Sequence, residues 1–70
     1  MAAKTHRNLV DPKAASKLIG DTPTGTMSNW RGRGVGPPYI KVGHHVRYDV
    51  ADLERWLEAN RVDPEEIEAQ

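Results

Sequence analysis

Residues 36–49 read Gly-Pro-Pro-Tyr-Ile-Lys-Val-Gly-His-His-Val-Arg-Tyr-Asp, and this segment constrains the fold more strongly than any other part of the chain. Two short runs of strand-forming residues flank the small loop 43–45, a pattern that predicts a β-hairpin. A three-residue loop pairs Val42 with Val46 and places the apolar side chains of both strands on one face. A two- or four-residue loop would divide them between two faces. We therefore predict the three-residue loop.

This register determines where two positive charges lie. It places Lys41 directly opposite Arg47 on the exposed face of the hairpin. Like charges that pair across two strands destabilise a sheet, and a polyanion would relieve their repulsion. The hairpin is therefore expected to contact phosphate groups.

The 70-residue chain has no net charge, but its charges are separated along the sequence. Residues 1–48 contain eight Lys or Arg and two acidic residues, a net of +6, whereas residues 49–70 contain two Arg and eight acidic residues, a net of −6. This asymmetry favours a surface that faces a polyanion and a separate acidic surface, although two solvated faces would give the same pattern. A short chain without cysteine or a long apolar run is not expected to be an enzyme, to use a cofactor or small-molecule substrate, or to enter a membrane.

Two helices are signalled by aspartate caps. Asp11 and Pro12 supply an N-cap and a first helical residue, and an apolar stripe predicts a helix over 12–19. Asp49 caps a later helix. The expected core residues of the two helices are Ala14, Ala15, Leu18 and Ile19 in the first, and Val50, Leu53, Trp56 and Leu57 in the later one.

Another short helix is predicted between these two. Pro23 opens it, Thr22 or Thr24 caps it, and it extends over about 24–31 before a stretch rich in glycine and proline ends it. Two short helices joined by a tight turn and followed by a β-hairpin form a winged helix-turn-helix. The predicted fold class is therefore α+β.

The predicted domain occupies residues 9–60. Residues 1–8 are expected to be a flexible N-terminal arm, and residues 61–70 an acidic C-terminal tail. Asp63-Pro64 can start a fourth short helix within that tail, although it has little apolar surface to bury.

Several segments, taken in order, resemble the small phage and plasmid excisionases (recombination directionality factors) and the related AlpA-like regulators. The resemblance covers about residues 9–60. The matching segments are 11–15 and 18–20 at the start, 25–31 in the recognition helix, 36–43 and 46–48 in the wing, and 52–57 in the closing helix. The resemblance implies an architectural protein of a bacterial cytoplasm, associated with the nucleoid, that bends an attachment site and biases an integrase toward excision.

The recognition helix can also be interpreted from its residues. On a helical wheel Met27 and Trp30 share one side, so Gly25, Ser28, Asn29 and Gly32 lie opposite. Small side chains permit close approach to base edges, and Asn29 can bind adenine through both amide groups. The candidate DNA-binding residues are Thr24, Gly25, Thr26, Ser28, Asn29, Arg31 and Arg33 in this helix, and Lys41, His44, His45 and Arg47 in the wing. An ordinary solvated face of small polar residues is the alternative.

Other chemistries fit less well. The three histidines lack a fixed arrangement of ligands, so no metal site is expected. The glycine-rich stretch 32–36 lacks a phosphate-loop lysine and does not open a helix, which favours a connector. Trp30 and Trp56 lie on apolar stripes and are predicted to pack in the core rather than to stack on single-stranded nucleic acid.

The sequence therefore favours a duplex-DNA-binding protein without catalytic activity. Its first expected role is that of an excisionase, which acts with an integrase and with neighbouring copies of itself on DNA. A transcriptional regulator of a phage or mobile element would use the same surface. A protein-interaction module that acts through the acidic C-terminal region remains a third interpretation.

Overall fold

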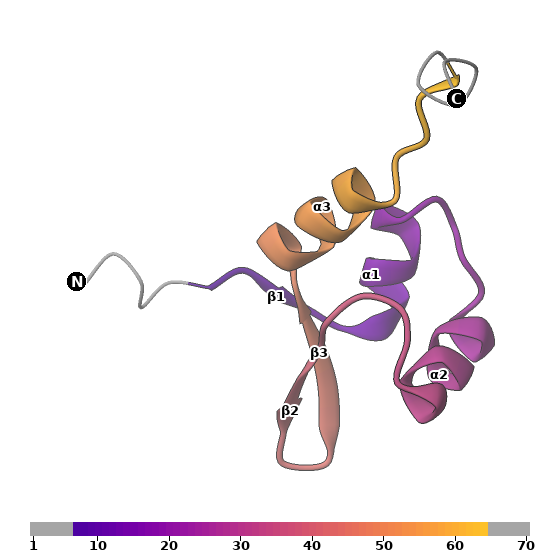
Figure 1. Cartoon of the computed structure of the whole chain (residues 1–70). Helices are drawn as coiled ribbons and strands as arrows, with labels where there is room; N and C mark the ends of the chain where they lie inside the picture. The colour runs from indigo at the N-terminus through magenta and orange to yellow at the C-terminus, as the bar shows by residue number, and fades with distance from the viewer. Residues whose placement is uncertain (1–6, 65–70) are drawn as a thin grey trace.

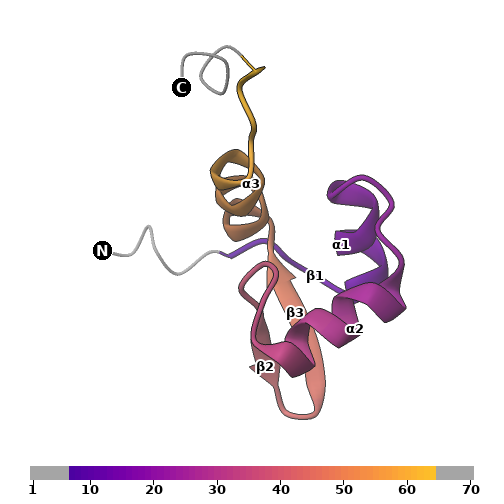
Figure 2. The ribbon, with the colours of Figure 1, turned by 45° about the vertical axis from the view of Figure 1, so that its right-hand side comes forward.

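The computed structural model describes residues 7–64 and contains three helices and three strands in that part of the chain (Figure 1). The elements in order are β1 (Leu9–Val10), α1 (Pro12–Leu18), α2 (Thr24–Arg33), β2 (Ile40–Val42), β3 (His45–Asp49) and α3 (Val50–Ala59). The three strands form an antiparallel sheet in which β3 lies between β1 and β2. The hairpin β2–β3 extends away from α1 and α3, with α2 beside it (Figures 1 and 2). The predicted winged helix-turn-helix is confirmed.

The buried core is small and draws on both helices and sheet. Its apolar members, none more than 7% exposed, are Ala15, Ile19, Met27, Tyr48 and Leu53, and Val10, Trp30, Val46 and Trp56 pack against them. The two tryptophan rings contact each other with their centroids 5.7 Å apart, as expected of core residues. Leu18 and Leu57, which we expected in the apolar stripes, are 49% and 40% exposed, whereas their neighbours Ile19 and Trp56 face the core.

Both predicted aspartate caps are confirmed. Asp11 Oδ1 accepts a hydrogen bond from the Ala14 amide at 2.8 Å, and Asp49 Oδ1 accepts one from the Ala51 amide at 3.0 Å. Each carboxylate satisfies an amide that the first turn of a helix leaves without an intrahelical partner. Helix α1 ends one residue before the predicted end.

The predicted threonine cap of α2 is wrong. Pro23 occupies the N-cap position, and no side chain forms a capping hydrogen bond there. Thr22 instead faces α1, because its Oγ1 donates to the Ile19 carbonyl at 3.1 Å and its own carbonyl accepts from the Ser16 hydroxyl. Thr22 therefore stabilises the turn between the two helices by hydrogen bonds to α1 and its C-cap, and it does not cap α2.

Helix α2 continues to Arg33, two residues beyond its predicted end, and Gly34 terminates it with a φ of 73°. The following loop returns across Trp30. A Cβ atom on Gly36 would lie 2.9 Å from the Trp30 ring, and the φ of Gly36 is 89°. Glycine is required here both by the backbone conformation and by the close contact, so the start of the wing is held against α2.

The predicted hairpin register is wrong by one residue. Ile40 pairs with Arg47, Lys41 with Val46, and Val42 with His45, which leaves a two-residue loop of Gly43 and His44. Gly43 has a φ of 65°, the positive value that a type II′ turn requires at its first loop position. This turn preference outweighs the burial of all four apolar side chains on one face.

The new register separates the side chains that we expected to face each other. Partners across two strands share a face, so Lys41 lies on the face of Val46 and Tyr48, which pack into or against the core. Arg47 lies on the opposite face. The predicted repulsion between Lys41 and Arg47 as direct cross-strand partners is therefore absent.

Strand β1 was not predicted, and the last two residues of the expected N-terminal arm, which precede it, contact the rest of the fold. The Asn8 carbonyl accepts a hydrogen bond from the Val50 amide at 3.0 Å, and Arg7 Nη1 lies 3.1 Å from Asp49 Oδ2. Residues 7 and 8 are thus attached to the start of α3. The rest of the expected arm, 1–6, lies outside the described residues, as do positions 65–70, where the fourth helix and most of the acidic tail were expected.

Candidate nucleic-acid interface

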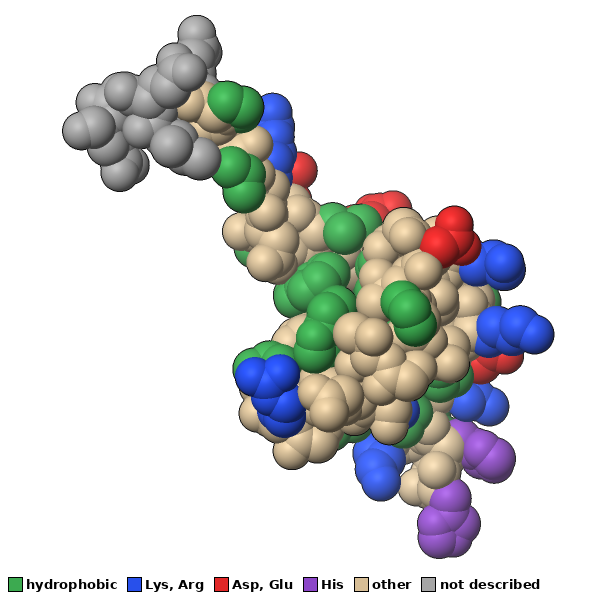
Figure 3. Space-filling view, turned by 90° about the vertical axis from the view of Figure 1, so that its right-hand side faces the viewer, with side chains coloured by type: hydrophobic (Ala, Val, Ile, Leu, Met, Phe, Trp, Pro, Cys, Tyr) green, Lys and Arg blue, Asp and Glu red, His purple; other side chains and the backbone are tan. Residues whose placement is uncertain are grey.

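One face of α2 packs against the core, and the opposite face is exposed to solvent. Met27 is fully buried and Trp30 is half-buried, which fixes the inward side as the helical wheel predicted. Six of the predicted contact residues of this helix are exposed, as is Gly32: these six are Thr24, Gly25, Thr26, Ser28, Asn29 and Arg33. Figure 3 views the molecule from the side on which α2 lies and shows a surface of small side chains and backbone between Lys and Arg side chains.

The two glycines on this face are not explained by packing. A Cβ atom at Gly25 or Gly32 would meet no atom within 4 Å, and neither residue has a positive φ. Glycine within a helix is less favourable than alanine by up to about 1 kcal/mol. These glycines lower the stability of α2 and leave its backbone uncovered by side chains at two positions on the outer face.

The N-terminus of α2 differs from those of α1 and α3. Its first turn has no side-chain cap and no acidic residue, whereas Asp11 and Asp49 cap the other two helices. The first-turn amides of a helix and its macrodipole together attract anions. In α2 no carboxylate caps that end of the helix or belongs to its first turn.

Arg31 does not share the exposure of its neighbours on α2. Its Nη1 donates a hydrogen bond to the Tyr48 hydroxyl at 2.7 Å, and its guanidinium carbon lies 5.9 Å from the centroid of the Tyr39 ring. The two tyrosine rings lie 6.3 Å apart. Sequence reasoning did not find this cluster, since no local pattern signals a contact between residues 17 positions apart.

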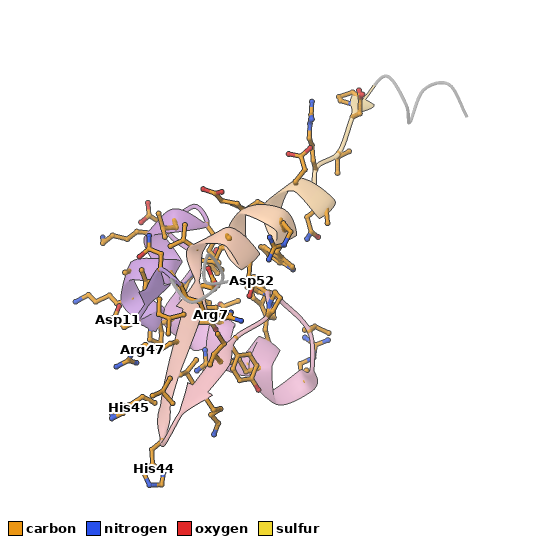
Figure 4. All side chains as sticks on the ribbon, turned by 90° about the vertical axis from the view of Figure 1, so that its left-hand side faces the viewer. Arg7, Asp11, His44, His45, Arg47 and Asp52 are labelled. Atoms are coloured by element: carbon orange, nitrogen blue, oxygen red, sulfur yellow. The ribbon has the colours of Figure 1, made fainter. Side chains whose placement is uncertain are left out.

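The wing presents three exposed basic or titratable side chains, those of Lys41, His44 and His45. Figure 4 shows His44 at the tip of the hairpin, with His45 and Arg47 projecting from one side of it. Arg47 is half-buried, and its Nη1 donates to the Val46 carbonyl at 2.7 Å. The four predicted wing residues thus lie together on the hairpin, although Lys41 and Arg47 occupy opposite faces.

The positive charges of α2 and the wing have no internal counterions in the described part of the chain. The ion pairs there join Arg7 to Asp49, Arg55 to Asp52 and Arg61 to Glu58, so they neutralise arginines at other sites. Of these cations, Arg33 and Lys41 are exposed and are therefore the most accessible to an external anion.

Two other kinds of site are absent from residues 7–64. No group of three or more His, Asp or Glu side chains lies close enough together to hold a metal ion. No helix there is sufficiently long and apolar to cross a membrane.

Residues 11–61 match a helix-turn-helix domain family, a span that begins at the α1 cap and ends just beyond α3. The chain belongs to this family. Membership indicates DNA binding, and the family includes excisionase-like and AlpA-like proteins. No curated protein and no solved structure gives a significant match.

Proposed function

We propose that this helix-turn-helix protein binds duplex DNA sequence-specifically, with α2 in the major groove and the wing against an adjacent minor groove or its phosphates. The observation that carries the proposal is the outer face of α2. This face carries only glycines and small side chains, the N-terminus of the helix is uncapped, and the flanking cations have no carboxylate partner among residues 7–64. A helix with these properties suits a groove lined by phosphates.

Each exposed residue of α2 has a proposed role. Asn29 binds an adenine edge through its amide, and Ser28 contacts a neighbouring base. Gly25 and Gly32 let the helix backbone approach the DNA closely. Thr24, Thr26 and Arg33 hold phosphates on either side, and Lys41, His44, His45 and Arg47 do so from the wing.

The biological role that we favour is that of an excisionase. The resemblance of residues 9–60 to that group supports it, as does the small size of the domain. A domain this small covers few base pairs, so several copies side by side would be needed to bend an attachment site for an integrase. A transcriptional regulator of a mobile element is the second candidate, because it would use the same contacts. Action through the acidic C-terminal region is the third, and deletion of residues 61–70 with retained duplex binding would separate it from the other two.

The proposal is tested by selecting a preferred duplex from a random library and titrating variants on it. Asn29→Ala should weaken binding to the preferred duplex by about 1–3 kcal/mol, because a paired contact with a base is lost. Binding to a scrambled duplex should change little. The matched control is Arg55→Ala, which removes a cation paired with Asp52 on α3 and should leave both affinities unchanged.

Two results would contradict the proposal. Failure to select any duplex would remove sequence-specific binding altogether. An equal loss on both duplexes for Asn29→Ala would show that this residue does not read a base.

A further inference from the structure

Arg31 joins the two parts of the proposed interface. It belongs to α2, whereas its hydrogen-bond acceptor, the Tyr48 hydroxyl, belongs to β3 of the wing. The Tyr39 ring, which immediately precedes β2, lies beneath the guanidinium at 5.9 Å. The bridge is therefore a direct side-chain tie from the recognition helix to the hairpin, in addition to the packing of α2 on α1 and of Trp30 on Trp56.

The bridge is built on a rigid base. Tyr48 is 1% exposed and is a member of the core, so its ring cannot shift without disturbing the packing. A hydrogen bond from a charged donor is stronger than one between neutral groups, and a planar guanidinium both donates in a fixed direction and stacks on an aromatic face. The position of Arg31 is therefore defined by two independent contacts.

We propose that Arg31 is a positioning residue that fixes α2 relative to the wing, and that it does not itself bind the DNA. This inference rests on the proposed function, since it concerns how the two surfaces reach one duplex together. Two contact surfaces held in the bound arrangement lose less conformational freedom on binding than two that move independently. Base reading then falls to Asn29 and phosphate binding to Arg33, among the residues beside it.

The decisive variant is Tyr48→Phe, which removes one hydroxyl and changes no charge. If Arg31 positions α2, this variant should bind the preferred duplex about tenfold more weakly, the loss expected for a hydrogen bond with a charged partner. If Arg31 contacted phosphate directly, freeing it from Tyr48 would leave the affinity unchanged or raise it. The matched control is Tyr39→Phe, which removes a hydroxyl from the same cluster but keeps the ring under the guanidinium, and it should bind as the wild type does.

Two further variants complete the test. Arg31→Lys keeps the positive charge but not the planar fork, so it should bind as weakly as Arg31→Met. Arg31→Met combined with Tyr48→Phe should be no weaker than either single variant, because both remove the same bridge. All affinities are measured well below each variant's melting temperature, so that loss of folded protein does not contribute. A role confined to fold stability would shift the melting temperature and leave the affinity of the folded protein unchanged.

The outcomes distinguish the inference from the proposed function. Full affinity in Tyr48→Phe, or rescue by Arg31→Lys, would overturn the positioning role while DNA binding stands. A wild-type protein that binds no duplex would overturn the proposed function, and the positioning role with it.

Discussion

Gly32 lowers the stability of α2 without serving the packing of the fold. It is exposed, a Cβ atom there would meet open space, and its φ is not in the left-handed region. Gly36 and Gly43, by contrast, have φ values of 89° and 65° that other residues rarely adopt. A glycine that neither packing nor backbone conformation requires at this position is consistent with the proposed close approach of DNA.

Gly32→Ala should therefore separate stability from binding. The variant should raise the free energy of unfolding by up to about 1 kcal/mol, because alanine is the better helix former. It should also weaken binding to the preferred duplex, because the added methyl group holds α2 away from the DNA. Urea denaturation and titration of the duplex measure the two effects.

The control for this variant is Gly43→Ala in the hairpin loop. It should lower the free energy of unfolding, because alanine at a positive φ is strained. If Gly32→Ala binds the duplex as tightly as the wild type, close approach at this position is wrong.

At the level of elements, local signals predicted more than distant ones did. The caps at Asp11 and Asp49 and the start of α2 follow from residues within one helical turn, and each is confirmed. Strand β1 was missed because its two residues pair with residues about 40 positions away in β3. The hairpin register was wrong because the preference of Gly43 for a tight turn competed with an apolar pattern that favoured another loop length.

The candidate site divides in the same way. The exposed residues of α2 follow from helical periodicity once Met27 is taken as the inward residue, and the structure agrees with that orientation. The contact of Arg31 with Tyr48 depends on how α2 lies against the hairpin, which no pattern within either element specifies. The sequence therefore predicted which residues of α2 are exposed, but not how α2 lies relative to the hairpin.

The corrected register changes what is expected of Lys41→Ala. Because Lys41 lies across from Val46, its removal relieves no direct cross-strand repulsion, so the free energy of unfolding should stay within about 0.5 kcal/mol of the wild-type value. If Lys41 binds phosphate, the variant should weaken binding to all duplexes alike and reduce the salt slope by about one unit. Nuclear Overhauser contacts between the backbones of residues 41 and 46 verify the register independently. Contacts between residues 41 and 47, with a stabilised variant, would restore the three-residue loop.

The molecule as a whole separates its charges more than its zero net charge suggests. In residues 7–64 the ion pairs lie along α3 and its two flanks, where carboxylates neutralise Arg7, Arg55 and Arg61. No such pair involves a Lys or Arg of α2 or of the hairpin. Figure 3 shows the histidines at the lower end of this face, with basic and acidic side chains interspersed above them. Within the described residues, the ion-paired arginines thus lie outside the two elements whose cations are proposed to contact DNA.

The most direct test of DNA binding through this surface is the affinity of the wild-type protein for its preferred duplex, measured between 50 and 200 mM salt. Over this range, every two phosphate contacts should lower the affinity by roughly tenfold. Each neutralised phosphate adds about −0.9 to the slope of log K against log salt concentration, so four to six contacts predict a slope between about −3.5 and −5.5. A slope in that range, with a similar slope on a scrambled duplex, is the predicted result. An affinity that does not change with salt would contradict the account.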